Sequence, residues 1–128
     1  MTTVRAGDQL PSLDIPITTT LVVAGALASR DYQDVHHDRA LAQQRGAKDI
    51  FMNILTTNGL VGRFVTDWAG PNAIIKKVSI RLGVPNYPGD TMQLTGRVAS
   101  MDEDGAVVEI RGANSMGDHV TGTVVVRV

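Results

Sequence analysis

The sequence predicts an α+β fold in which a curved antiparallel sheet wraps around one long helix. Three observations support this prediction: one long helical pattern occupies residues 50–69, a series of turn-separated strands follows it, and the pattern offers no second long helix. A sheet must bury a face against another layer, so a single helix is most economically enclosed when the sheet curves around it.

The N-terminal segment is expected to be mostly extended. Residues 10–16 mix Pro, Ser and Asp, which is typical of an extended lead-in. Residues 17–28 are rich in Thr and Val and then in Ala, so their first half predicts a strand and their second half suits either a strand or a helix. We therefore expect a strand to begin at Ile17.

A polar, histidine-containing stretch follows from Arg30 to Asp38. At its end, Asp38 is a suitable N-cap for a short helix over Arg39–Arg45, because its side chain can accept a hydrogen bond from an amide of the first turn. Gly46 is suited to end this helix.

The long helix is predicted over Ile50–Ala69. Apolar residues at positions 50, 54, 61, 65 and 68 form a helical stripe, and charged residues are sparse on the other sides. A helix of this composition is expected to be buried. Asp49 is expected to stabilise its N-terminus by capping, and Gly70 with Pro71 ends it.

Strands are predicted after the helix, and the breaks between them are rich in turn-forming residues. In the last strand Val120, Val124 and Val126 alternate with Thr121 and Thr123, which is the period of a strand. The short breaks favour antiparallel pairing of consecutive strands. One central helix enclosed by such a sheet is the hot-dog fold. The predicted strands are Ile74–Val84, Asp90–Ser100, Ala106–Asn114 and His119–Val128.

The composition excludes several classes of function. The chain has 128 residues, 43% of them hydrophobic, so one domain over residues 1–128 is expected. The net charge of −1 and the scattered basic residues argue against nucleic acid or an anionic membrane as a partner. The absence of cysteine excludes disulfides and thiol catalysis. Neither a signal peptide nor the stretch of about 20 apolar residues that spans a membrane is visible, so a cytoplasmic protein is expected.

Candidate catalytic residues gather in the stretch from residue 30 to 38, which contains Asp31, Asp34, His36 and His37. Hydration of a conjugated thioester needs a base that takes a proton from water and an acid that delivers a proton to the α-carbon. A carboxylate and an imidazole on either side of one water meet both needs. Asp31 and His36 are the predicted pair. His37 and Asp34 are interpreted as turn residues, and His119 as a structural residue of a later turn.

The stretch resembles the signature of the MaoC-like hydratase family, in which Asp is followed by x-Asn-Pro-aliphatic-His. Asp31 and His36 match the Asp and the His, Val35 matches the aliphatic position, and Gln33-Asp34 replaces the Asn-Pro. Three further segments resemble the family in the same order, so the resemblance covers essentially the whole chain: Ala6–Pro11, Leu60–Gly70 and Pro88–Thr91.

The resemblance implies a hot-dog enoyl-CoA hydratase that acts on an acyl-CoA with no metal or redox cofactor. It also implies an oxyanion contact at the start of the long helix, where a family glycine binds the thioester oxygen through its backbone N–H. Asn53 stands at that position here and Ile54 follows it, and both are predicted to contact the substrate.

More narrowly, residues 31–38, 48–55 and 66–71 resemble the small MaoC-like subunit of an actinobacterial steroid side-chain hydratase. This implies a steroid CoA thioester as substrate and a second MaoC-like hot-dog subunit as partner, in some cases fused to a DUF35 or OB domain. The complex would be a heterodimer or heterotetramer, and otherwise a homodimer is expected. Three alternatives stay open: an acyl-CoA thioesterase on the same fold, a non-catalytic scaffold subunit, and a dehydratase of fatty-acid synthesis.

Overall fold

The computed structural model describes residues 3–128, in which one strand is followed by all the helices and then by the other four strands of a five-stranded sheet. The helices are α1 (Thr19–Ala28), the single 3₁₀ turn η1 (Asp34–His36), α2 (Arg39–Gln44) and α3 (Ile54–Ala69). The strands are β1 (Gln9–Pro16), β2 (Ile74–Leu82), β3 (Thr91–Asp102), β4 (Gly105–Asn114) and β5 (Gly117–Arg127).

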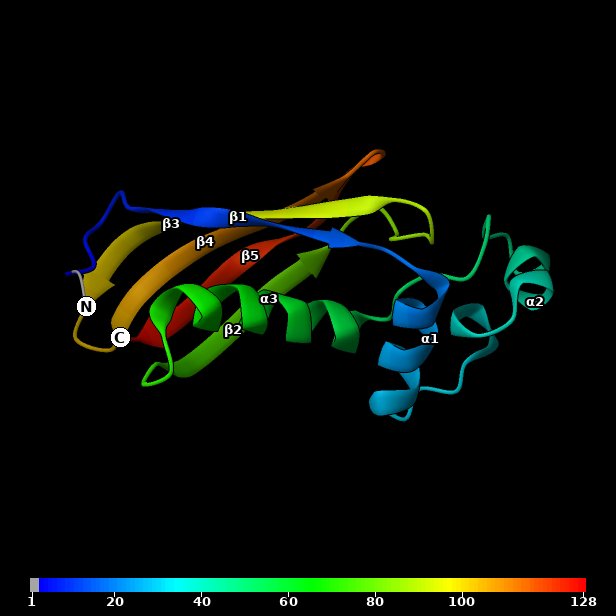
Figure 1. Ribbon diagram of the computed structural model, residues 1–128, viewed down its shortest axis with the longest axis horizontal. Coiled ribbons are helices and arrows are strands. Elements are labelled where there is room, and N and C mark those ends of the chain that lie inside the picture. Colours follow the sequence, from blue (N-terminus) through cyan, green and yellow to red (C-terminus); the bar gives the residue numbers. More distant parts are fainter. Residues whose placement is uncertain (1–2) are drawn as a thin grey trace.

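The sheet is antiparallel throughout, in the order β1-β3-β4-β5-β2, and it curves over α3 (Figure 1). The core lies between them, where Val61 and Val65 of α3 are buried with Leu94, Val108 and Val124 of the sheet. Beyond one end of the sheet, α1 packs beside the N-terminal end of α3, and α2 lies farther out against η1 (Figure 1). The predicted hot-dog fold is thus confirmed.

The expected strand at Ile17 is wrong. The strand is instead the preceding segment, β1, which pairs with β3 so that Leu13 faces Leu94. The Thr- and Val-rich segment forms α1, because Thr18 accepts a hydrogen bond from the amide of Leu21 at 3.0 Å and caps the helix. Its β-branched residues fit a helix since tertiary packing buries one helical stripe, with Val22 and Ala26 fully covered.

The long helix begins four residues later than predicted, and its N-cap is Asn53 rather than Asp49. Two backbone bonds hold the chain extended before the helix: the amide of Phe51 donates to the carbonyl of Val35, and the amide of Met52 donates to the carbonyl of Asn86, both at 3.1 Å. Asn53 Oδ1 then accepts from the amide of Thr56 at 3.0 Å. The helix is also exposed on one side rather than buried throughout, since Ile54 and Leu55 are about half exposed.

The predicted strands match β2 to β5 with small shifts at their ends, but the expected pairing of all consecutive strands is wrong in one place. β2 pairs with β5 and not with β3, so the connection over residues 83–90 carries the chain across the sheet to a place beside β4 and β1. The short helix α2 is as predicted: Asp38 caps it by accepting from the amide of Leu41 at 3.1 Å. Within residues 3–128, no helix is long and apolar enough to cross a membrane.

Candidate active site

Asp31 lies where α1 ends. The chain leaves this helix through a pair of reversed hydrogen bonds, from the amide of Arg30 to the carbonyl of Leu27 at 3.0 Å and from the amide of Asp31 to the carbonyl of Ala26 at 2.9 Å. Arg30 takes the left-handed conformation that this motif requires, with φ of 55°, although it is not a glycine. This turn directs Asp31 toward η1, which carries His36.

The predicted pair meets: Asp31 Oδ2 lies 3.3 Å from His36 Nε2. The imidazole of His36 is buried, and its Nδ1 lies 2.6 Å from the carbonyl oxygen of Phe51. A carbonyl can only accept, so Nδ1 carries a hydrogen and donates it. In the neutral ring Nε2 is then unprotonated, so it can accept a proton from a group that binds beside the pair.

The carboxylate of Asp31 is fixed by two donors on separate oxygens. The amide of Gln33 donates to Oδ1 and the side-chain amide of Asn53 donates to Oδ2, each at 3.2 Å. Burial raises the pKa of Asp31, but these hydrogen bonds and the neighbouring imidazoles of His36 and His37 outweigh it, so the pKa lies below its ordinary value. Asp31 is therefore ionised at neutral pH.

Asn53 connects this carboxylate to the central helix. Its Oδ1 caps α3, while its Nδ2 donates both to Asp31 Oδ2 and to the hydroxyl of Ser29 at 2.9 Å. The side chain is buried and every polar atom in it is bonded to protein. It is therefore committed to positioning the carboxylate, a role that the sequence left open, and it leaves the backbone amides of Asn53 and Ile54 at the positive end of the helix dipole.

His36, Asn53 and Ile54 line one cavity of about 180 Å³. Apolar groups, a stretch of backbone and the imidazole of His119 form the rest of its wall. The remaining lining residues are Phe51, Met52, Leu82, Gly83, Val84, Pro85 and His119. The cavity is thus bounded by the imidazole of the pair on one side and the start of α3 on another, whereas Asp31 is not among its lining residues.

His119 lies in the last strand as predicted, but its burial was not expected. It lies in β5 with 2% of its surface exposed, and burial lowers its pKa against the opposing effect of its hydrogen bond to the carbonyl of Val84. The period-two pattern of the strand could not reveal this, because a register shift between Gly112 and Ala113 places both His119 and Val120 inside. His37 and Asp34 do not join the pair: His37 Nε2 lies 2.7 Å from the backbone carbonyl of Asp31, and Asp34 forms an ion pair with Arg45.

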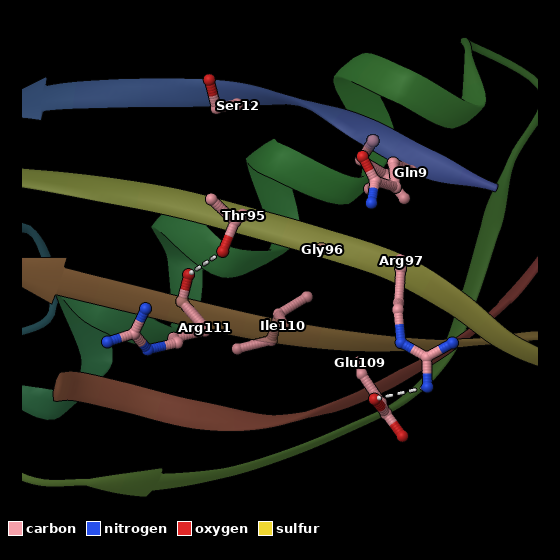
Figure 2. A pocket seen from close by; sticks show the side chains of 9 residues that line it. Gln9, Ser12, Thr95, Gly96, Arg97, Glu109, Ile110 and Arg111 are labelled. Atoms are coloured by element: carbon pink, nitrogen blue, oxygen red, sulfur yellow. Dashed lines mark hydrogen bonds and ion pairs between the residues drawn. The ribbon is translucent and has the colours of Figure 1, made fainter. Parts of the chain in front are cut away.

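A larger hollow, of about 550 Å³, lies on the outer face of the sheet over β1, β3 and β4. Figure 2 shows its polar lining, in which Arg97 pairs with Glu109 at 3.4 Å and Thr95 donates to the backbone of Arg111. It contains neither the Asp31–His36 pair nor a helix N-terminus, so size alone does not make it the reactive site. Within residues 3–128, no group of three or more potential ligands could hold a metal ion.

Fold and site together define a hot-dog protein with a carboxylate–imidazole pair at the start of its central helix. The family model for the MaoC-like domain matches residues 3–118. The chain belongs to the MaoC-like domain family.

Individual relatives agree with this assignment. The chain is 52% identical over 118 residues, 92% of each protein, to the beta subunit of 3-oxo-4,17-pregnadiene-20-carboxyl-CoA hydratase from Mycobacterium tuberculosis. It is 51% identical to a chain in the crystal structure of the ChsH1–ChsH2 complex from the same organism, with a TM-score of 0.93, 99% of this chain covered and 98% of that one. The (R)-hydratase from A. caviae shares the fold, with a TM-score of 0.89 at 22% identity over 100% of this chain and 99% of that chain.

Proposed function

We propose that this chain is the catalytic subunit of an enoyl-CoA hydratase, which adds water across the 2-enoyl double bond of an acyl-CoA. The observation that carries the proposal is the 3.3 Å approach of Asp31 Oδ2 to His36 Nε2 beside the N-terminus of α3. The family and the hydratase relative support the same activity.

In the proposed mechanism one water binds beside the pair, in contact with both Asp31 and His36. Nε2 of His36 takes its proton, because Nδ1 is already committed as a donor to Phe51. The carboxylate of Asp31 orients the water and stabilises the imidazolium that forms. As the oxygen bonds to the β-carbon, the π electrons move to the thioester oxygen, where the amides of Asn53 and Ile54 stabilise the enolate. The imidazolium then returns the proton to the α-carbon on the same face.

The proposed substrate is a steroid side-chain CoA thioester, because the 52% identical relative is a hydratase of a pregnadiene carboxyl-CoA. The proposed partner is a second MaoC-like hot-dog subunit, in a heterodimer or heterotetramer, because that relative is a beta subunit and the solved structure is of a complex. The reaction as proposed uses no cofactor beyond the CoA of the substrate. We place the protein in the cytoplasm.

The test is hydration of steroid and straight-chain enoyl-CoAs by the complex of this chain with its partner, followed as loss of enoyl absorbance. Asp31→Asn and His36→Gln are each expected to lower kcat by about 10²- to 10⁴-fold. Asp34→Asn is the matched control, since it changes a carboxylate of the same segment that binds Arg45 and not the site.

Two outcomes would contradict the proposal. Unchanged turnover in both variants would make this chain a scaffold whose partner performs the chemistry. Release of free CoA with the double bond intact would indicate a thioesterase.

A further inference from the structure

His119 makes hydrogen bonds through both ring nitrogens inside the protein. Nδ1 lies 2.7 Å from the carbonyl oxygen of Val84, to which it donates, and Nε2 lies 2.8 Å from Oγ1 of Thr57. With Nδ1 as the donor, the neutral ring accepts the hydroxyl hydrogen of Thr57 at Nε2. His119 and Thr57 are both buried, so water does not compete for these bonds.

The local backbone is shaped to bring the imidazole inward. The register shift in β5 opposite Gly112 and Ala113 is a bulge, and bulges re-aim a side chain that alternation would point to solvent. The connection after β2 approaches this bulge closely: the amide of Gly83 donates to the carbonyl of His119 at 2.7 Å, and a Cβ at Gly83 would overlap the backbone oxygen of Asp118. Gly83, Val84 and His119 all line the cavity that His36 borders.

Thr57 stands in the first turn of α3, one helical turn after Asn53. Its amide donates to the carbonyl of Asn53 at 3.3 Å, so the Thr57 hydroxyl and the helix start move together. The imidazole therefore links two walls of the cavity, the first turn of α3 and the segment around Val84, through one pair of bonds.

We propose that His119 is a positioning residue for the hydration reaction, which holds the helix start through Thr57 so that the amides of Asn53 and Ile54 meet the thioester oxygen. The inference rests on the proposed function for its chemistry. His119 itself transfers no proton, since both nitrogens are occupied by protein groups. Its contribution is to the geometry of the oxyanion contact, which strengthens as the enolate forms.

The test compares variants of both partners in the full complex. Thr57→Val removes the hydroxyl at nearly constant shape, and Thr57→Ser keeps it. His119→Asn keeps a donor near Val84 but loses the acceptor for Thr57, whereas His119→Gln keeps an acceptor near Thr57. Thr57→Val and His119→Asn are each expected to lower kcat about five- to tenfold with KM unchanged, after correction for the folded fraction. Thr57→Ser and His119→Gln are expected to retain most of kcat, and the double variant Thr57→Val/His119→Asn to lose no more than either single one.

A purely structural role would lower the melting temperature without this split between kcat and KM. Wild-type kcat in Thr57→Val, equal losses in Thr57→Val and Thr57→Ser, or additive losses in the double variant would overturn the inference. Hydrogen exchange of the amides of residues 53–57 tests the His119–Thr57 link separately from the proposed function. Faster exchange in Thr57→Val than in Thr57→Ser supports the link even if the wild-type complex hydrates no enoyl-CoA. Equal exchange in the two variants refutes it.

Discussion

Asp31 and His36 could be selected from the sequence because they match the Asp and the His of the MaoC-like signature, whereas their spacing alone is a weak signal. The short segment between them ends in the 3₁₀ turn η1, which includes His36, so a separation of five residues suffices to bring the two side chains together. The role of the Asn53 side chain was not accessible in the same way. It depends on where α3 begins, and that is decided by backbone bonds from Phe51 and Met52 to residues distant in the sequence.

The bond from Asn53 to Asp31 gives a prediction at this scale. Asn53→Ser keeps an N-cap for α3 but removes the donor to Asp31 Oδ2. We expect the pKa of Asp31 to rise toward the ordinary 3.8, because one of the hydrogen bonds that lower it is lost. The measurement is an NMR titration of the Asp31 carboxyl carbon, with Asp34, whose pKa is lowered by Arg45, as internal reference.

The same shift has a consequence for stability. Since the folded-state pKa of Asp31 lies below 3.8, its contribution to stability is complete above that pH and is lost as the pH falls through the folded pKa. In Asn53→Ser the contribution is expected to be smaller and its loss to be complete at a higher pH, as followed by denaturant unfolding between pH 5 and about 2. An Asp31 titration identical in the two proteins would contradict this account of the site.

At the scale of elements, periodicity placed the strands β2 to β5 and the body of α3 well, because each buries one regular face. It failed for the segment after Ile17. Val22 and Ala26 lie one helical turn apart and are both buried, yet their neighbours are also apolar, so the sequence shows no contrast between faces. The helical state of α1 depends on its contact with α3, which a local pattern does not contain.

That contact is unusually close and yields a second prediction. A Cβ at Gly25 of α1 would overlap the side chain of Thr56 in α3. Gly25→Ala is expected to lower the free energy of unfolding by about 1–3 kcal/mol through overpacking, against the gain of up to about 1 kcal/mol that alanine brings to a free helix. Denaturant unfolding measures the difference.

Thr56→Ala provides the matched background for this experiment, because it removes Oγ1 and Cγ2, the two atoms that the new methyl group would overlap most. Gly25→Ala should cost clearly less in that background than in the wild type. Equal costs in the two backgrounds would mean that the new methyl group does not press on Thr56, and would contradict the prediction.

At the scale of the whole molecule, the order of strands was the feature that the sequence could not supply. Short breaks suggest consecutive pairing, but the connection from β2 to β3 crosses the sheet and leaves β2 as an edge strand. An edge strand exposes unpaired backbone groups and is a place where a second chain can add. The sequence of β2, IIKKVSIRL, carries three basic residues and no acidic one.

Like charges on facing strands repel, so two copies of this edge are poorly suited to pair with each other. We expect the chain without its partner subunit to remain monomeric at low ionic strength and to self-associate only when salt screens the edge. Sedimentation equilibrium at about 20 mM and about 500 mM salt checks this expectation.

Lys76→Glu/Lys77→Glu is the informative variant, since it should allow copies of opposite local charge to approach when mixed with the wild type. A stable wild-type dimer at low salt would contradict the prediction and favour the homodimer.

The shared amide group of Asn53 constrains how this protein can evolve. The nitrogen of this group holds the carboxylate of Asp31, while the oxygen beside it caps the central helix. A substitution that removes both groups therefore affects the helix start and the carboxylate in a single step, and only a replacement that keeps a capping oxygen, such as serine, separates the two. Lineages that replace Asn53 should carry a compensating change nearby, with Ser29 as the first place to look, since it accepts from the same nitrogen.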